Sequence, residues 1–210
     1  MGLWPAHAIG DDVELFSDLS KQKSVGKFCF VRRQQVIPNQ AQFCLSDYIA
    51  PKESGRMDYL GAFAVNAGKE VDELAEKYKS DNDDFTSILV KSLGDRFAEA
   101  TAEYAHKKIR DLWGFGESEG LTNEDYIAEK YRGIRPAAGY PCQPDHTEKD
   151  LIWDLLDVKK QIGLELTESR AMNPGCSVSG LYFSNPQSRY FNVGSLGRDQ
   201  VEDYARRKGW

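Results

Sequence analysis

YLGAFAVN, residues 59–66, is a continuous apolar run that lies between Pro51 and Gly55 on one side and Gly68 on the other. A run of this length with turn residues at both ends predicts a strand buried on both faces of a sheet. Other apolar or alternating segments predict further strands at residues 12–15, 27–30 and 41–49. The first third of the chain is therefore expected to be β-structure with connecting loops.

The middle of the chain is expected to be helical. Residues 70–79 carry a short amphipathic pattern, and a longer one begins at Asp83 or Asp84 and ends near Asp111. Residues 121–131 predict a further short helix. In the long helix, side chains three or four positions apart predict the buried face: Leu89, Leu93, Phe97, Ala100 and Tyr104.

The last third begins with a loop rich in glycine and proline, residues 133–146. A helix is expected over residues 146–162, with Asp145 and Glu148 spaced as in a capping box. Short strands are expected at 165–172, 179–183 and 189–193, the last two as a hairpin, before a closing helix at 198–208. Strands and helices come in groups, which favours an α+β fold with a largely antiparallel sheet. The sequence shows neither a linker nor an internal repeat, so one domain over residues 1–210 is expected.

Composition excludes several classes of protein. Of the 210 residues, 40% are hydrophobic, enough for a core, and the net charge of -6 argues against a nucleic-acid binder. No apolar run approaches the roughly 18 residues that span a bilayer, and the N-terminus does not resemble a secretory signal. The cysteines are scattered, as in reduced cytoplasmic proteins: Cys29, Cys44, Cys142 and Cys176. We expect a cytoplasmic protein that binds neither nucleic acid nor membrane.

The loop RPAAGYP, residues 135–141, is the first candidate binding site. Its prolines stiffen it, while Ala137, Ala138 and Gly139 leave the backbone uncovered, so that peptide groups can face a planar ligand such as adenine. Arg135 can bind a carboxylate through two parallel hydrogen bonds. The alternative is a rigid connector with Arg135 in a structural ion pair, and residue types alone favour the connector.

Other candidates are weaker. Glu99 is surrounded by alanines on the long helix, which would let a ligand approach, and Glu129 lies six residues before Arg135. Most helical glutamates are simply solvated, and without further information this explanation is favoured for both. Tyr182, Tyr190 and Phe191 can stack on a ring, but aromatic residues in hairpins usually pack across strands.

Common catalytic motifs are missing from the sequence, including the dinucleotide-binding glycine pattern, the phosphate-binding loop and the zinc protease motif. Cys142 and His146 have the spacing of half a zinc site, but the sequence contains no second half. We predict that the chain has no metal site.

Four long segments together resemble one family, in order and at near-constant spacing. They are FCLSDYIAPKESGRMDYLGAFAV (43–65), GIRPAAGYPCQPDHTEKDLIWDLL (133–156), LTESRAMNPGCSVSGLYFSNPQSRYF (166–191) and DQVEDYARRKG (199–209). The chain resembles the C-terminal activation domain of cobalamin-dependent methionine synthase, from about Trp4 to the C-terminus. The resemblance implies a C-shaped α+β module with a bent, largely antiparallel sheet flanked by helices.

The family's function implies the following expectations. The cobalamin of the synthase occasionally oxidises to inactive cob(II)alamin, and the activation domain then supplies a methyl group from S-adenosylmethionine while a flavodoxin or flavodoxin-like reductase supplies one electron. The partners would be the cobalamin-binding domain and the flavodoxin. The module would hold a cosubstrate within methionine biosynthesis, and it is not expected to be catalytic alone, since the nucleophile is cobalt on a neighbouring domain.

The resemblance also implies roles for individual residues. Arg135 matches the arginine that holds the methionyl carboxylate, and Tyr190 matches a tyrosine that closes over the ligand. Glu99 and Glu129 match acidic residues near the ligand. The stretch whose backbone contacts the adenosyl part matches Ala137, Gly139 and Tyr140.

One departure from the family leaves an alternative open. The family's module begins with a further stretch before the position of Trp4, including an aspartate that contacts the ligand's amino group, and nothing in this chain matches it. We therefore expect weaker binding of S-adenosylmethionine than in a longer chain, and exposed apolar surface. The alternative is a protein-interaction module that docks on a corrinoid or flavin protein without binding S-adenosylmethionine.

Overall fold

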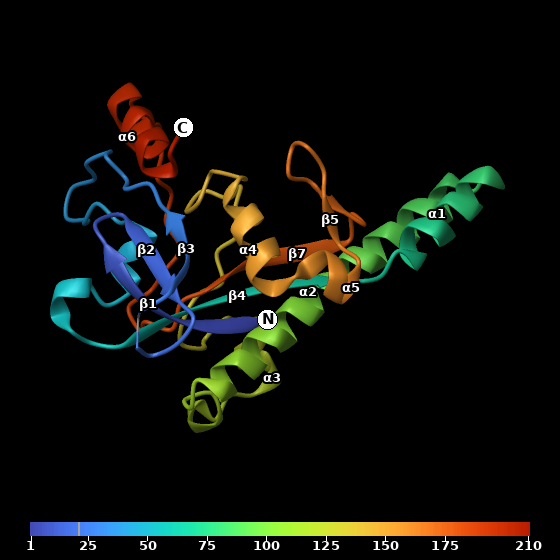
Figure 1. The fold of residues 1–210 in the computed structure, drawn as a ribbon. Helices are drawn as coiled ribbons and strands as arrows, with labels where there is room; N and C mark the ends of the chain where they lie inside the picture. The colour runs from blue at the N-terminus through green and yellow to red at the C-terminus, as the bar shows by residue number, and fades with distance from the viewer. Residues whose placement is uncertain (21) are drawn as a thin grey trace.

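The computed structural model describes residues 1–20 and 22–210, and within them one five-stranded sheet forms the centre of the molecule (Figure 1). The strand order is β3-β2-β1-β4-β7, and every pairing is antiparallel. The strands are β1 (Gly2–Ile9), β2 (Asp12–Phe16), β3 (Ser24–Cys29), β4 (Asp58–Asn66) and β7 (Ser177–Tyr182). The sheet is bent and flanked by helices, so the predicted α+β class is confirmed.

β4 is buried on both faces, as its apolar sequence predicts. Leu60 belongs to the main core cluster, which also contains Ile152 of the helix α4 (Glu148–Leu156). Phe63, on the opposite face, packs with Ala102 and Ile109 of the helix α2 (Asp84–Leu112). β4 therefore lies between two helical layers, α4 on one face of the sheet and α2 on the other.

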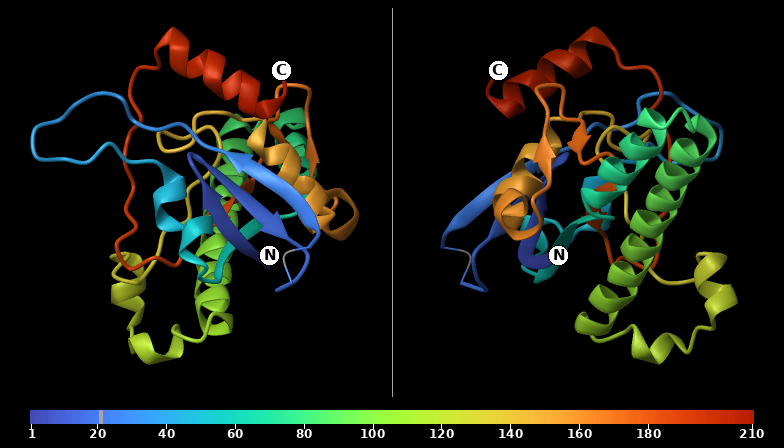
Figure 2. Two further views of the ribbon diagram at one scale, coloured as in Figure 1. Left: turned by 60° about the vertical axis from the view of Figure 1, so that its left-hand side comes forward. Right: turned by 90° about the vertical axis from the view of Figure 1, so that its right-hand side faces the viewer.

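The remaining helices lie around this centre (Figures 1 and 2). α1 (Glu70–Ser80) packs along α2, and α3 (Asn123–Ile127) follows the C-terminal end of α2. The other elements are α5 (Val158–Ile162), α6 (Arg198–Lys208), the small sheet of β5 (Glu165–Leu166) and β6 (Met172–Asn173), and the short 3-10 turns η1 (Leu45–Tyr48), η2 (Lys52–Ser54) and η3 (Glu117–Glu119). Among the described residues, none of the helices is both long enough and apolar enough to cross a membrane.

The predicted buried face of α2 is wrong. Leu89, Leu93, Phe97, Ala100 and Tyr104 are all exposed, Phe97 by 67% and Tyr104 by 60%. The buried face is instead made largely of small residues, among them Gly94, Ala98 and Ala102. A Cβ at Gly94 would lie 2.6 Å from Val71 Cγ1. Side-chain size, rather than hydrophobicity, therefore sets this face, because only small residues allow so close an approach.

Four expected elements also differ from the structure. Residues 41–49 form the turn η1 instead of a strand, and the helix expected over 146–162 is broken at Asp157, whose φ of 48° ends α4. Residues 189–193 do not pair with β7 in a hairpin, since Ile134 exchanges two backbone hydrogen bonds of 3.0 Å with Phe183 and takes that position. The expected strand at 165–172 is reduced to β5 and β6.

The capping box expected at Asp145 and Glu148 is replaced by a buried ionic cluster. The N-cap of α4 is Thr147, and Glu148, 1% exposed, accepts hydrogen bonds from Lys208 Nζ (2.7 Å) and Tyr204 Oη (2.9 Å) of α6. The backbone N–H of Cys29 in β3 donates to the same carboxylate at 3.2 Å. Glu148 therefore joins α4, α6 and the sheet.

We predict that Lys208→Met lowers the free energy of unfolding by about 3 kcal/mol, because it leaves a buried carboxylate without its cation. Tyr204 and Cys29 still donate to Glu148, which places the loss at the lower end of the range for broken buried pairs. Urea denaturation measures the change, and the matched control is Arg206→Met, at an exposed position on the same helix. A similar small loss in both variants would show that the Glu148–Lys208 pair does not stabilise α6.

Candidate functional site

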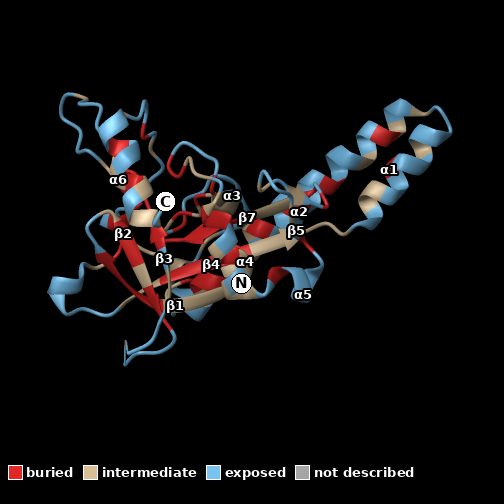
Figure 3. Cartoon of the chain, turned by 45° about the horizontal axis from the view of Figure 1, so that its top comes forward, coloured by how far each residue is buried: buried red, intermediate tan, exposed pale blue. Residues whose placement is uncertain are grey.

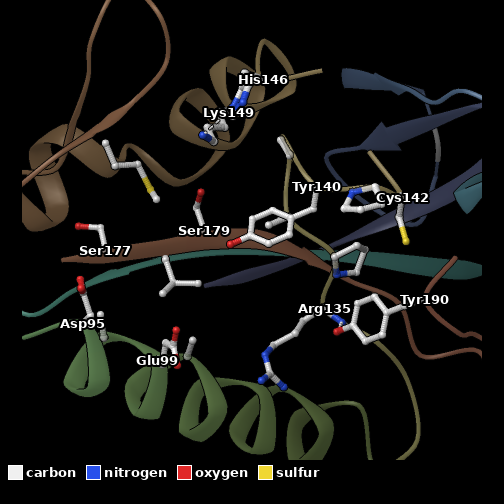
Figure 4. A pocket seen from close by; sticks show the side chains of 18 of the residues that line it. Asp95, Glu99, Arg135, Tyr140, Cys142, His146, Lys149, Ser177, Ser179 and Tyr190 are labelled. Atoms are coloured by element: carbon white, nitrogen blue, oxygen red, sulfur yellow. Dashed lines mark hydrogen bonds between the residues drawn. The ribbon is translucent and has the colours of Figure 1, made fainter. Parts of the chain in front are cut away.

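A cavity of about 940 Å³ lies between α2, the loop of residues 135–142, β7 and the first turn of α4 (Figure 4). Asp95 and Glu99 approach it from α2, and His146 and Lys149 lie on the opposite side, as Figure 4 shows. Both polar and apolar side chains line it, and Ser177 and Ser179 of β7 are among the polar ones.

The loop that forms one wall is fixed by backbone hydrogen bonds. The carbonyl of Pro136 accepts from the N–H of Leu181 at 2.9 Å, which ties the loop to β7. The N–H of Gly139 donates to the carbonyl of Gln143 at 2.7 Å. Gly139 has a φ of 95°, and a Cβ there would lie 2.1 Å from the ring of His146. Both the conformation and the close approach therefore require glycine at this position.

Arg135 enters the cavity from the start of this loop, and its side chain is 19% exposed. Its Nη2 lies 2.6 Å from Glu103 Oε2 and 3.7 Å from Glu129 Oε1, and its Nη1 donates to the hydroxyl of Tyr131. Burial opposes its charge, but Tyr131 and Glu103 more than offset this, so the pKa of Arg135 is raised. Its backbone N–H donates to the hydroxyl of Tyr190 at 3.1 Å.

The structure brings most of the expected binding residues together. The cavity is lined by Glu99, Arg135, Ala137, Tyr140 and Tyr190. Gly139 lies behind this surface against His146, and Glu129 contacts the site only through Arg135. Glu99 pairs with Arg96 at 3.0 Å on the exposed side of α2, so its carboxylate reaches both solvent and cavity.

Several lining residues were not identified from the sequence. Asp95 precedes Glu99 by one helical turn, so it shares that face of the helix. Ser177 and Ser179 alternate along β7 on one face of the strand. Lys149 Nζ donates to the backbone carbonyl of Arg170 at 3.0 Å, and burial lowers its pKa. The spacings of Asp95 and of the two serines were visible in the sequence, but the orientation of each element was not.

Cys142 has a structural role in the cavity wall. Its Sγ lies 2.8 Å from the backbone carbonyl of Phe191 and accepts from the N–H of the same residue at 3.1 Å. Burial raises the pKa of the Cys142 thiol, which keeps it protonated. Within residues 1–20 and 22–210, no three His, Cys, Asp or Glu side chains are grouped so that they could hold a metal ion.

The family model described as the activation domain of vitamin B12 dependent methionine synthase matches residues 1–209. The chain belongs to this family. The fold is also similar to a solved structure described as the crystal structure of the MetH reactivation domain bound to AdoHcy, with 52% sequence identity and a TM-score of 0.97. That match covers 99% of this chain and 64% of the other, so the chain spans about two thirds of the length of its solved relative.

A buried polar cluster lies beneath Arg135 in this activation domain. His106, 1% exposed, stacks on Tyr182 with ring centroids 5.0 Å apart and meets the ring of Tyr131 edge-on. Arg110 lies with its guanidinium carbon 4.2 Å from the centroid of Tyr131 and donates from Nε to Glu119 at 3.0 Å. Burial, with Arg110 and Arg135 nearby, lowers the pKa of His106 to about 2. His106 is therefore neutral in the folded activation domain.

We predict that His106→Phe, which keeps a ring against Tyr182, makes stability less dependent on pH below 6.5. Unfolded wild type binds a proton at His106 with an ordinary pKa, whereas the folded state does not, so wild-type stability falls as pH drops. The loss specific to His106 is about 2 kcal/mol between pH 7.5 and pH 5. Urea denaturation of both proteins at both pH values measures it. Parallel pH dependence in the two proteins would contradict a neutral His106.

Proposed function

We propose that this chain binds S-adenosylmethionine in the cavity between α2 and the loop of residues 135–142, as the methyl donor for reductive reactivation of cob(II)alamin. Membership of the activation-domain family supports this, and so does the structural match to a reactivation domain bound to AdoHcy. AdoHcy is what remains of S-adenosylmethionine after the methyl group has left. The observation that carries the proposal is that five of the seven expected ligand-binding residues line a single cavity.

The chemistry of the cavity matches that of the ligand. S-adenosylmethionine carries a carboxylate, an ammonium, a sulfonium and an adenine ring. Arg135 supplies a fixed cation for the carboxylate, and Asp95 and Glu99 supply negative charge along the α2 side. The backbone of Ala137 and Tyr140 supplies peptide groups for the adenosyl part. Because Tyr140 and Tyr190 remain exposed at its edge, the cavity is open to an acceptor from another domain.

The methyl acceptor in this proposal is cobalamin on a neighbouring domain of methionine synthase. One electron from a flavodoxin or flavodoxin-like reductase, together with the methyl group of S-adenosylmethionine, converts cob(II)alamin to methylcobalamin and releases AdoHcy. The residues of this chain bind and orient the methyl donor, and they form no covalent bond with it. We place the protein in the cytoplasm, where its four free, buried cysteines stay reduced.

A second candidate function is suggested by the exposed apolar side chains of α2, among them Leu93, Phe97 and Tyr104. In Figure 3 the ends of α1 and α2 project from the body of the molecule and are largely exposed. Such a surface suits a module that docks on a corrinoid or flavin protein without binding S-adenosylmethionine. Calorimetry of the chain with S-adenosylmethionine separates the two, since only the first proposal predicts saturable binding with one ligand per chain.

We predict that Arg135→Ala and Arg135→Lys each weaken the binding of S-adenosylmethionine by more than about tenfold while the fold is kept. Lysine keeps the charge but cannot make two parallel hydrogen bonds to a carboxylate. Titration calorimetry measures the affinity, and circular dichroism checks the fold. The control is Arg198→Lys, at an exposed arginine of α6. Unchanged affinity in both Arg135 variants would remove this residue from the binding site.

A further inference from the structure

We propose that Glu103 and Tyr131 are positioning residues that hold the guanidinium of Arg135 in the orientation that binds the ligand's carboxylate. This inference rests on the proposed function and adds two residues to it. Neither lines the cavity in the described structure, so both act through Arg135.

The contacts to Arg135 define the orientation of its side chain. Glu103 Oε2 lies 2.6 Å from Nη2, and the hydroxyl of Tyr131 accepts from Nη1. The same hydroxyl lies 3.4 Å from Glu103 Oε2, so the two partners also contact each other. A guanidinium has five N–H donors, and these two contacts use one from each terminal nitrogen. The remaining donors, including Nε–H, are left for a ligand carboxylate.

The ring of Tyr131 is held in place by two residues of α2. Arg110 packs on the face of its ring, and the edge contact with His106 comes from the same helix. Arg110 is in turn paired with Glu119. The hydroxyl of Tyr131 therefore has a defined position without a ligand, which lowers the cost of ordering Arg135 on binding.

Glu129 explains why Arg135 needs this support. Its Oε1 lies 3.7 Å from Nη2, and its side chain is more than half exposed. Without Glu103, Glu129 is the nearest remaining carboxylate to the guanidinium, and pairing with it would draw Arg135 away from α2. Glu103 thus keeps the guanidinium between α2 and the loop.

The charge of Glu103 has little net effect on the ligand itself. The amino-acid end of the ligand carries a carboxylate and an ammonium on the same carbon atom. A nearby negative charge repels the first and attracts the second, and the two effects largely cancel. The orientation of Arg135 therefore decides the effect of a Glu103 substitution.

The test uses Glu103→Gln and Tyr131→Phe with two probes, S-adenosylhomocysteine and its decarboxylated analogue S-adenosyl-3-thiopropylamine. The second probe keeps the adenosyl group and the ammonium but has no carboxylate. We expect Glu103→Gln to weaken S-adenosylhomocysteine binding about tenfold and Tyr131→Phe about threefold, in line with the loss of an ion pair and of a hydrogen bond to an uncharged hydroxyl. Affinity for the decarboxylated analogue should stay within about twofold in both variants. The control is Glu202→Gln, an exposed glutamate of α6 paired with Arg198.

Three results would overturn the inference. Unchanged S-adenosylhomocysteine affinity in both variants would show that Arg135 is positioned without them. Equal losses for both probes would show that Glu103 acts on the ammonium or on the whole cavity. If Glu103→Gln does not fold, Tyr131→Phe decides alone, and an equal loss for both probes in that variant refutes the role.

If the wild-type chain itself binds neither probe, the proposed function fails rather than this addition to it.

Discussion

The close approach of α2 to the sheet is the constraint from which the rest of the site follows. A Cβ at Gly94 would lie 2.6 Å from Val71 Cγ1 of α1 and 2.8 Å from Sγ of Cys176, the residue before β7. Ala102 packs with Phe63 of β4 and Tyr182 of β7. A second close approach lies nearby, where a Cβ at Gly180 of β7 would lie 2.7 Å from the carbonyl of Pro136. Small residues thus place both the helix and the loop against the same strand, and the cavity lies between them.

Charged side chains are distributed unevenly between α2 and the loop of residues 135–142. α2 presents Asp95, Glu99 and Glu103 at successive turns, and the loop presents Arg135 opposite the last of them. A ligand with a carboxylate at one end and positive charge along its length matches that order. The polar groups buried below Arg135 contribute rigidity, because each of them is packed between aromatic rings.

The sequence predicted some of these features and not others, for physical reasons. β4 was predicted because a strand buried on both faces must be continuously apolar. β1 was not identified, although it lies beside β4, since Gly2–Ile9 combines small residues, a proline and a histidine. The buried face of α2 was mistaken because large apolar side chains were taken as core, whereas from Ser87 to Ala102 this helix buries small ones.

The candidate site was predicted in part. Its loop is conspicuous in sequence because glycine, alanine and proline constrain the backbone directly, and the family resemblance then gave Arg135 and its neighbours their roles. Glu103 and Tyr131 carry no such signal, since a helical glutamate and a tyrosine after a short helix are common. Their importance depends on a contact between positions 103 and 135, which only the folded chain shows.

A crystal structure of this chain with S-adenosylhomocysteine would show whether Arg135 holds the carboxylate of the ligand. We expect the ligand between α2 and the loop of residues 135–142, with its carboxylate within hydrogen-bond distance of the Arg135 guanidinium and the Arg135–Glu103 pair intact. A ligand bound elsewhere, or one bound in this cavity with its carboxylate directed away from Arg135, would contradict this expectation.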